Sequence, residues 1–282
     1  MSAQLLSLPP AFQVSQSSLQ DYAICARRFQ LRYLMEQEWP TPAAEPLGDA
    51  EQADMLGKRF HRLVERYWLD LPIERDKIDA TLRPWWDAFL QHPIPDLPAG
   101  IRRAEVRTSA VVHGQRMVAT FDLLAYNATG DVMIVDWKTT KRRSSRAWLD
   151  RRLQTVIYPL LLIESAPRLI GRVLKPEQVR LVYWFANAPT EIEVFQYSTM
   201  RYEQDQQTLA YLIDQLLSTQ AAVWPLTNDV KQCRLCQYRS LCNRGSEAGS
   251  YDDIDTIDEL GDIEDMSNGT GSFLEQPDDF VL

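Results

Sequence analysis

Apolar positions in the first third of the chain recur every three or four residues, which is the spacing of one buried helix face. A helix is predicted over residues 15–34, with Ser17 or Ser18 as its N-terminal cap. Two more helices are predicted over 51–70 and 79–91, before closely spaced prolines end the helical pattern. The N-terminal third is therefore expected to be helical.

The middle of the chain changes to β-structure. Residues 104–112, 115–126 and 131–138 are rich in β-branched and aromatic side chains, and short glycine-containing connections separate them. Such connections join antiparallel neighbours, so an antiparallel three-stranded meander is predicted. Every position in 132–135 is apolar, as expected for a strand that is covered on both faces.

The remaining part of the chain mixes helices with strands. A helix is predicted over 145–165, two strands near 178–186 and 191–197, and a last helix over 199–220. The order of helices, three strands, a helix, two strands and a helix predicts an α/β domain with a mixed sheet flanked by helices.

Charge is unevenly distributed along the 282 residues, whose net charge is −9. Residues 246–282 contain 12 acidic and no basic side chains, whereas the remainder has 30 basic and 27 acidic ones, a net charge of +3. This acidic tail is expected to be disordered because it has little apolar content. No apolar stretch is long enough to cross a bilayer and the N-terminus has no secretory pattern, so we expect a cytoplasmic protein without a membrane partner.

Two charged residues, Asp136 and Lys138, interrupt the apolar strand and share one of its faces, because strand side chains alternate. If Tyr126 pairs with Asp131 across the turn, Asp122 lies opposite the residue before Asp136. Two carboxylates would then meet on neighbouring strands. The alternative is a simple ion pair at a strand end, and the nearby Asp122 favours a site instead.

Glu105, on the preceding strand, is close enough to reach the same region. Clustered carboxylates repel one another unless a cation lies between them, and oxygen ligands suit Mg²⁺ or Mn²⁺. A lysine beside them can orient an attacking water or neutralise the charge that develops on a phosphate. This combination predicts phosphodiester hydrolysis.

At these residues the sequence resembles the PD-(D/E)XK nuclease superfamily, in particular its RecB-like branch. Asp122 matches the first acidic residue of that motif, with Phe121 in place of the proline, and the segment from Asp136 to Lys138 matches its second half. The resemblance implies a restriction-endonuclease-like fold. Through the segments GKRFH and QTVIY, it also implies a metal-ligand role for His61 and active-site roles for Gln154 and Tyr158.

The four cysteines are Cys25, Cys233, Cys236 and Cys242, and three of them lie within ten residues. A disulfide framework is unlikely in a cytosolic chain, and four thiolates can hold either zinc or an iron–sulfur cluster. One cysteine before the core and three after it resemble the CRISPR-associated RecB-like exonucleases and the AddB subunit of helicase–nucleases. That resemblance implies a structural [4Fe–4S] cluster, with zinc as the less favoured occupant, that staples the two ends of the domain together.

A basic run follows the predicted catalytic lysine and would bring phosphates close to the metal. Its members are Lys141, Arg142, Arg143, Arg146, Arg151 and Arg152. DNA, as single strands or ends, is the expected partner, without sequence specificity, although RNA remains an alternative.

The chain is accordingly divided into an extension over 1–14, a RecB-like nuclease domain over 15–245 with a helical insertion at about 40–100, and the acidic tail over 246–282. The expected function is that of a metal-dependent DNA nuclease, and by resemblance an exonuclease, in DNA repair, recombination or CRISPR-related DNA processing. The alternatives are a catalytically silent nuclease-like module that binds DNA or a helicase, and a zinc-stapled interaction module. The tail is expected to compete with DNA for the basic surface or to bind a helicase, recombination or CRISPR protein.

Overall fold

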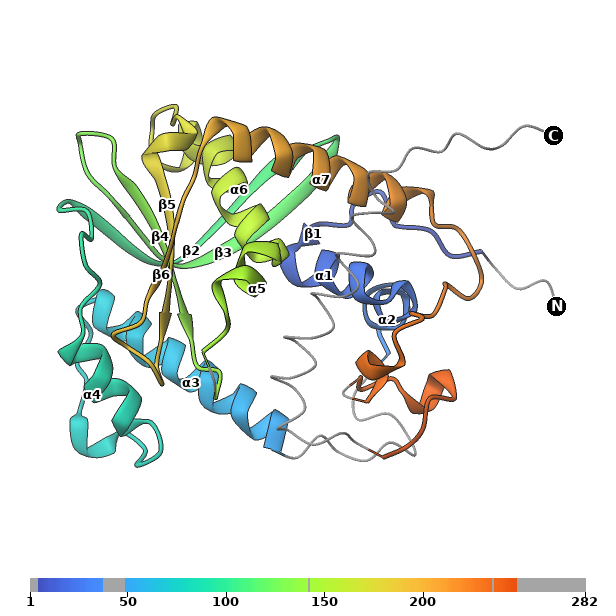
Figure 1. Ribbon diagram of the computed structural model, residues 1–282, viewed down its shortest axis with the longest axis horizontal. Helices are drawn as coiled ribbons and strands as arrows, with labels where there is room; N and C mark the ends of the chain where they lie inside the picture. Colours follow the sequence, from blue (N-terminus) through green and yellow to red (C-terminus); the bar gives the residue numbers. More distant parts are fainter. Residues whose placement is uncertain (1–4, 38–48, 142, 235, 248–282) are drawn as a thin grey trace.

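The computed structural model describes residues 5–37, 49–141, 143–234 and 236–247 (Figure 1). Most of the acidic tail, part of the proline-rich segment and Arg142 therefore lie outside the described residues. Within the described part, no helix combines the length and the apolar character that a membrane crossing requires.

A six-stranded mixed sheet forms the centre of the molecule, in the order β1-β3-β4-β5-β6, with β2 paired to β3. The meander β2–β3–β4 is antiparallel as predicted, while β4 and β5 run parallel and β6 returns antiparallel. The mixed α/β architecture is thus confirmed. The strands are β1 Val14–Ser15, β2 Ile101–Val112, β3 Gln115–Tyr126, β4 Val132–Lys138, β5 Val179–Phe185 and β6 Glu193–Gln196.

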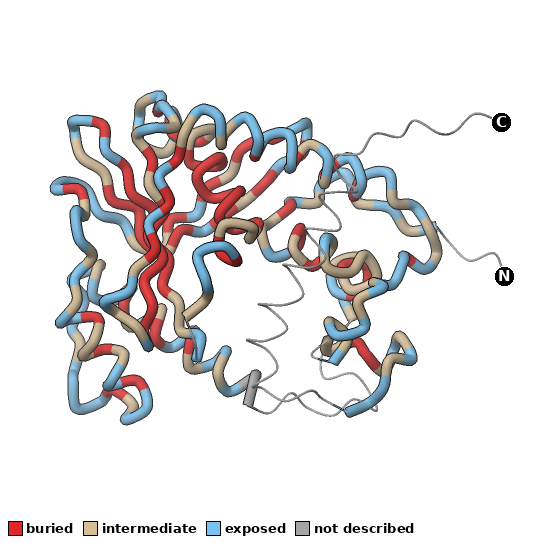
Figure 2. Tube along the Cα trace, viewed as in Figure 1, coloured by how far each residue is buried: buried red, intermediate tan, exposed pale blue. Residues whose placement is uncertain are grey.

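Helices cover both faces of this sheet, and each face has its own apolar core (Figures 1 and 2). One core packs under α3 Asp49–Trp68 and α4 Arg83–Gln91 and includes Trp137 of β4. The other packs under α6 Leu153–Leu169, α7 Thr199–Ser218 and α1 Gln16–Ile24. Residues 132–137 of β4 are buried throughout, as expected for a strand between two helical layers.

The β3–β4 turn corrects the predicted register by one residue, because Tyr126 pairs with Val132 and not with Asp131. The Oδ1 atom of Asn127 accepts hydrogen bonds from the backbone N–H groups of Gly130 and Asp131, both at 3.0 Å. This side-chain bonding keeps Asp131 within the loop. Continued by one residue, the observed register places Asp122 opposite Asp136 itself.

Two predicted helices are each interrupted by an extended residue. The helix expected over 15–34 breaks at Cys25 (φ −161°, ψ 109°), between α1 and α2 Ala26–Phe29, which continues as the π-helix η1 Gln30–Leu34. The backbone N–H of Arg27 donates to Pro225 O at 2.9 Å, a contact with a distant segment that helical periodicity does not reveal.

The cap of α1 is Ser15, in a reciprocal capping box with Ser18, and not Ser17 or Ser18 itself. The helix expected over 145–165 divides at Arg152 into α5 Arg146–Arg151 and α6. The other predicted helices are present with shifted ends, the largest shift being the start of α4 at Arg83.

Candidate active site

The β3–β4 hairpin holds two carboxylates and a lysine beside one another. Asp122 Oδ2 accepts a hydrogen bond from the Trp137 backbone N–H at 2.8 Å, which ties β3 to β4 where their regular pairing ends. Asp136 is only 3% exposed, and its Oδ2 lies 2.7 Å from Lys138 Nζ. The predicted meeting of Asp122, Asp136 and Lys138 is therefore observed.

A residue of α6 completes the contacts of this pair. Gln154 accepts a hydrogen bond from Lys138 Nζ at 2.7 Å through its Oε1, and its Nε2 donates to Asp136 Oδ1. Both charged groups are therefore fixed by a neutral amide. Tyr158, one helical turn further along α6, is buried and packs edge-on against Phe121 with ring centroids 5.2 Å apart.

Glu105 reaches the site through an unusual backbone conformation. Its φ is +47°, although the pairs on either side of it, Ala104 with Leu123 and Val106 with Phe121, keep one register. Phe121 packs in the core under α6, whereas Leu123 packs in the core under α3, so the alternation of β3 changes phase at Asp122. A non-glycine residue in this region costs about 1–3 kcal/mol and persists where its surroundings impose it, often at functional sites.

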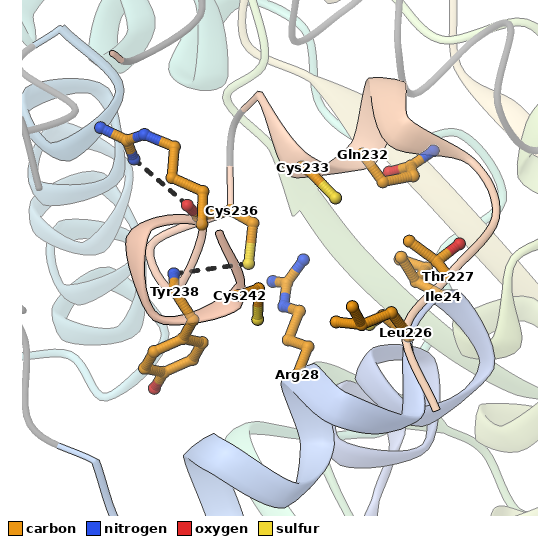
Figure 3. A pocket seen from close by; sticks show the side chains of 11 residues that line it. Ile24, Arg28, Leu226, Thr227, Gln232, Cys233, Cys236, Tyr238 and Cys242 are labelled. Atoms are coloured by element: carbon orange, nitrogen blue, oxygen red, sulfur yellow. Dashed lines mark hydrogen bonds between the residues drawn. The ribbon is translucent and has the colours of Figure 1, made fainter. Parts of the chain in front are cut away.

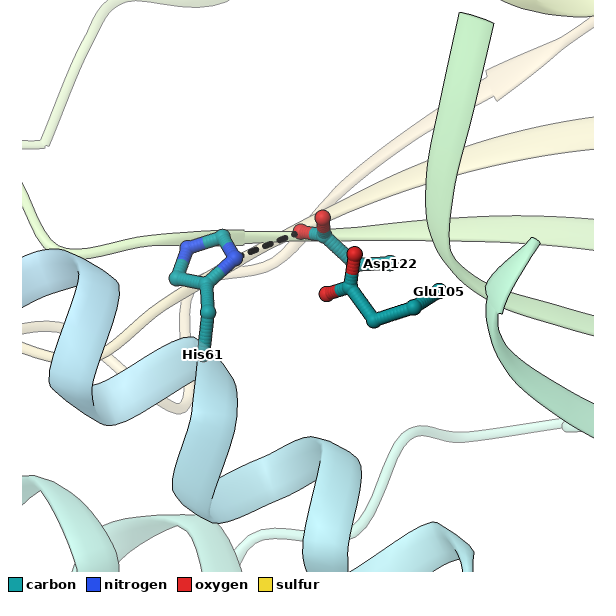
Figure 4. A group of neighbouring side chains, drawn as sticks. All are labelled: His61, Glu105 and Asp122. Atoms are coloured by element: carbon teal, nitrogen blue, oxygen red, sulfur yellow. Dashed lines mark ion pairs between the residues drawn. The ribbon is translucent and has the colours of Figure 1, made fainter. Parts of the chain in front are cut away.

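His61 approaches these carboxylates from α3. Its Nδ1 lies 3.3 Å from Asp122 Oδ2 (Figure 4), and one ligand atom from each of His61, Glu105 and Asp122 lies within 4.8 Å of the other two. Asp136, also predicted as a ligand, is outside this three-residue group of described residues and is instead held by Lys138 and Gln154. Three elements thus supply one nitrogen and two carboxylate donors to one point.

Burial and neighbouring charges raise the pKa values of three groups in and beside this cluster. Burial by itself lowers the pKa of His61, but the hydrogen bond and the charge of Asp122 outweigh it and raise the pKa to about 9. Burial, followed by the charge of Asp122, raises the pKa of Glu105 to about 7. Burial also raises the pKa of Asp136, although Lys138 opposes this change. A cation bound by these groups would take the place of protons.

Two contributors to the site were missed by the sequence analysis. Tyr183 of β5 lies under Lys138 Nζ, which is 5.1 Å from its ring centroid. Gly57, one turn before His61 on α3, lies so close to β4 that a Cβ atom there would be 2.7 Å from Thr139 Oγ1. The segment GKRFH contained this glycine, but only the packed structure shows that it lets α3 approach the end of β4.

Residues 13–243 match the sequence model of one family, described as the PD-(D/E)XK nuclease superfamily. The chain belongs to the PD-(D/E)XK nuclease superfamily. The matched span includes Asp122, Asp136 and Lys138, whose assignment to the family motif stays a prediction.

Two solved structures are similar to this superfamily member. The structure named SSO0001 has 15% sequence identity and a TM-score of 0.42, covering 83% of this chain and 87% of its own. A protein from Eubacterium rectale, described provisionally as an exonuclease, has 10% identity and a TM-score of 0.48, covering 73% and 80%. A search of curated proteins finds no match.

The four cysteines of this superfamily member line one small pocket (Figure 3). Cys25 comes from the break between α1 and α2, and the other three come from the segment that contains the short helices η4 Val230–Cys233 and η5 Ser240–Cys242. Among the described residues, no three of their sulfur atoms all lie within 4.8 Å of one another. Burial raises the pKa of the Cys233, Cys236 and Cys242 thiols.

Part of the predicted basic surface is engaged in internal ion pairs. Arg143 and Arg146 both bind the carboxylate of Glu193 on β6, with Arg146 Nη1 at 2.8 Å from Glu193 Oε2. Arg152 stacks over Trp148, at 4.4 Å from its ring centroid. The two ion pairs with Glu193 hold the segment after Lys138 against β6. A DNA-binding role for the basic run remains a prediction.

Proposed function

We propose that this protein is a metal-dependent deoxyribonuclease of the RecB-like branch, acting as an exonuclease with little sequence specificity. The observation that carries the proposal is the convergence of His61, Glu105 and Asp122 beside the Asp136–Lys138 pair. Membership of a nuclease superfamily supports the choice of substrate. The same geometry on a protein without nuclease relatives would suggest only a cation site.

A divalent cation fits the donors that are present, and the two carboxylates suit Mg²⁺ or Mn²⁺. His61, Glu105 and Asp122 would hold the ion. Bound there, it would neutralise charge on the scissile phosphate and acidify a water molecule.

The protein groups would then act as follows. Lys138, held by Asp136 and Gln154, presents an ammonium group that stabilises negative charge as the phosphodiester bond breaks. Gln154 positions both charged partners. Burial, then the charges of Asp136 and Asp122, raise the pKa of Tyr158, so its hydroxyl stays protonated and supports the wall of the site.

We also propose that Cys25, Cys233, Cys236 and Cys242 hold a [4Fe–4S] cluster. The order of the cysteines along the chain, one before the core and three after it, is what supports a cluster over zinc in this proposal. Arg28 extends into the same pocket (Figure 3) and would offset the negative charge of four thiolates.

The cluster would close a loop of 208 residues between Cys25 and Cys233, within a domain that spans residues 15–245. We propose that the acidic tail, residues 246–282, binds a helicase, recombination or CRISPR protein or competes with DNA for the basic surface. The pathway would then be DNA repair, recombination or CRISPR-related DNA processing.

The test is a cleavage assay on the anaerobically purified protein, with single- and double-stranded DNA labelled at either end. Cleavage that begins at an end, requires Mg²⁺ or Mn²⁺ and stops with EDTA is the expected result. DNA binding without cleavage under all these conditions would overturn the enzymatic proposal and leave a silent binding module. Iron content and absorbance near 400 nm would distinguish a cluster from zinc.

A further inference from the structure

A second cavity lies beside the candidate active site, between the end of α3, the segment that follows α4 and the start of β2. Its volume is about 410 Å³, within the range of roughly 300–1,000 Å³ that is typical of small-ligand pockets. Six of the residues that line it are Tyr67, Trp68, Phe89, His92, Ile94 and Arg102. Much of this wall belongs to the helical insertion, whose part after His61 has no role in the proposed chemistry.

Two residues that line this cavity lie on the same elements as members of the metal-binding group, a few residues away from them. Trp68 follows His61 by seven residues on α3, which places the two on the same helix face at about 10 Å along the axis. Arg102 precedes Glu105 by three residues on β2, again at about 10 Å. A spacing of about 10 Å corresponds to one or two nucleotides of an extended strand, so a strand with its phosphate at His61 and Glu105 has the length to reach the cavity.

The cavity combines aromatic rings with one arginine, Arg102, and its lining also includes one acidic residue, Asp96. The Arg102 guanidinium lies 5.6 Å from the centroid of the Trp68 ring, and Tyr67 is 42% exposed. Arg180, which is not part of the lining, donates from its Nη2 to the backbone oxygen of the lining residue Asp96 at 3.2 Å. Aromatic rings that stack on bases, together with arginines that meet phosphates, are typical of single-strand binding surfaces.

We infer that this cavity is a nucleoside subsite, which accepts one unpaired base of a nucleotide near the scissile phosphate while Arg102 contacts the adjoining backbone. The inference rests on the proposed nuclease function and adds a substrate class to it. A base can enter only when it is unpaired, so the subsite selects single-stranded nucleic acid next to the cut. The insertion would thus serve substrate selection.

The experiment measures binding of a labelled oligothymidylate in Ca²⁺ in place of Mg²⁺, with one abasic position moved along the strand. We expect one position at which loss of the base lowers affinity about tenfold, the size of one base–aromatic stacking contact. In Trp68→Leu the same abasic substitution should have no further effect, since base and ring act together. Trp85→Leu, an aromatic change on α4 outside the cavity lining, is the matched control.

Arg102→Gln keeps the inference testable if Trp68→Leu does not fold, because Arg102 is exposed. It should weaken binding of the intact strand about fivefold and lower the slope of affinity against salt by about one ion. Arg75→Gln, whose side chain is 70% exposed elsewhere on the insertion, should do neither.

The outcomes separate the two claims. A wild-type protein that neither binds nor cuts DNA overturns the proposed function, and the subsite with it. A wild-type protein that cuts DNA but shows no sensitive abasic position, and whose Arg102→Gln variant binds like Arg75→Gln, overturns the subsite alone. The latter result would indicate an acidic peptide as the ligand of the cavity, because an arginine beside aromatic rings can also bind a carboxylate.

Discussion

The carboxylate site and the cysteine pocket could each hold metal, but they are supported by opposite kinds of structure. The first stands on paired strands between two apolar cores, and Asp122, Asp136 and Lys138 each have a protein partner. The second stands on short helical turns and on a helix break at Cys25. The fold therefore positions the carboxylates before any cation binds, whereas the cysteine segment, if it holds the proposed cluster, should depend on that cluster for its structure. Loss of the carboxylate site should therefore reduce cleavage activity, whereas loss of the cysteine site should reduce the stability of the fold.

The largest effect is expected from Asp136→Asn, which should reduce cleavage at least about a hundredfold, as for removal of one group that stabilises charge in a transition state. Stability should be unchanged or higher, because burial raises the pKa of Asp136 and so opposes its charged form at neutral pH. Single-turnover cleavage and thermal unfolding measure the two effects. Asp214→Asn, at an exposed aspartate, is the control, and full cleavage by Asp136→Asn would refute the assignment.

The opposite pattern is expected for Cys236→Ser. A staple over a loop of about 200 residues restricts the unfolded chain by roughly 5 kcal/mol, by analogy with a disulfide. Its loss should lower the melting temperature by roughly 10–20 °C for a domain of this size. Iron per protein and absorbance should fall in the same variant, while Asp136→Asn keeps both. A Cys236→Ser protein with unchanged iron and melting temperature would contradict the comparison.

The sequence predicted the three charged residues of the carboxylate site and their neighbour Gln154, but other supports of the two sites could not be predicted, for a physical reason. Apolar runs and alternation specify strands locally, so Asp122 and Asp136 could be placed within one residue of their observed register. The left-handed backbone of Glu105 and the bond from Arg27 to Pro225 depend on contacts between distant segments. The same holds for the ion pairs of Arg143 and Arg146 with Glu193. The pattern of charges along the sequence does not predict these pairs.

An effect of intermediate size is expected in the pH dependence of metal binding at the carboxylate site. The pKa of His61 is raised to about 9 and that of Glu105 to about 7, so both groups bind protons in the metal-free protein at pH 6.5. A cation must displace these protons, and its affinity should therefore rise with pH from 6.5 to 9, by roughly tenfold per proton displaced and pH unit. Mn²⁺ titration followed by electron paramagnetic resonance measures this affinity. A pH-independent affinity would show that the ion does not bind at His61 and Glu105.

The smallest predicted effect concerns how accurately the fold positions His61. Gly57→Ala places a methyl group 2.7 Å from Thr139 Oγ1, which is too close, so α3 or the threonine side chain must shift. Helix propensity favours alanine by up to about 1 kcal/mol, so the variant should be as stable as wild type. Mn²⁺ affinity and cleavage should nevertheless fall a few-fold, because His61 moves with α3.

Thr139→Ala removes the obstructing hydroxyl, so the double variant Gly57→Ala/Thr139→Ala should recover both metal affinity and cleavage, while Thr139→Ala alone should resemble wild type. Rescue of this kind distinguishes a shift in position from a loss of folding. If Gly57→Ala alone cuts and binds Mn²⁺ like wild type, the close approach of α3 to β4 does not position His61. The carboxylate site would then tolerate a displacement of α3, and the fold would position it less strictly than its contrast with the cysteine pocket requires.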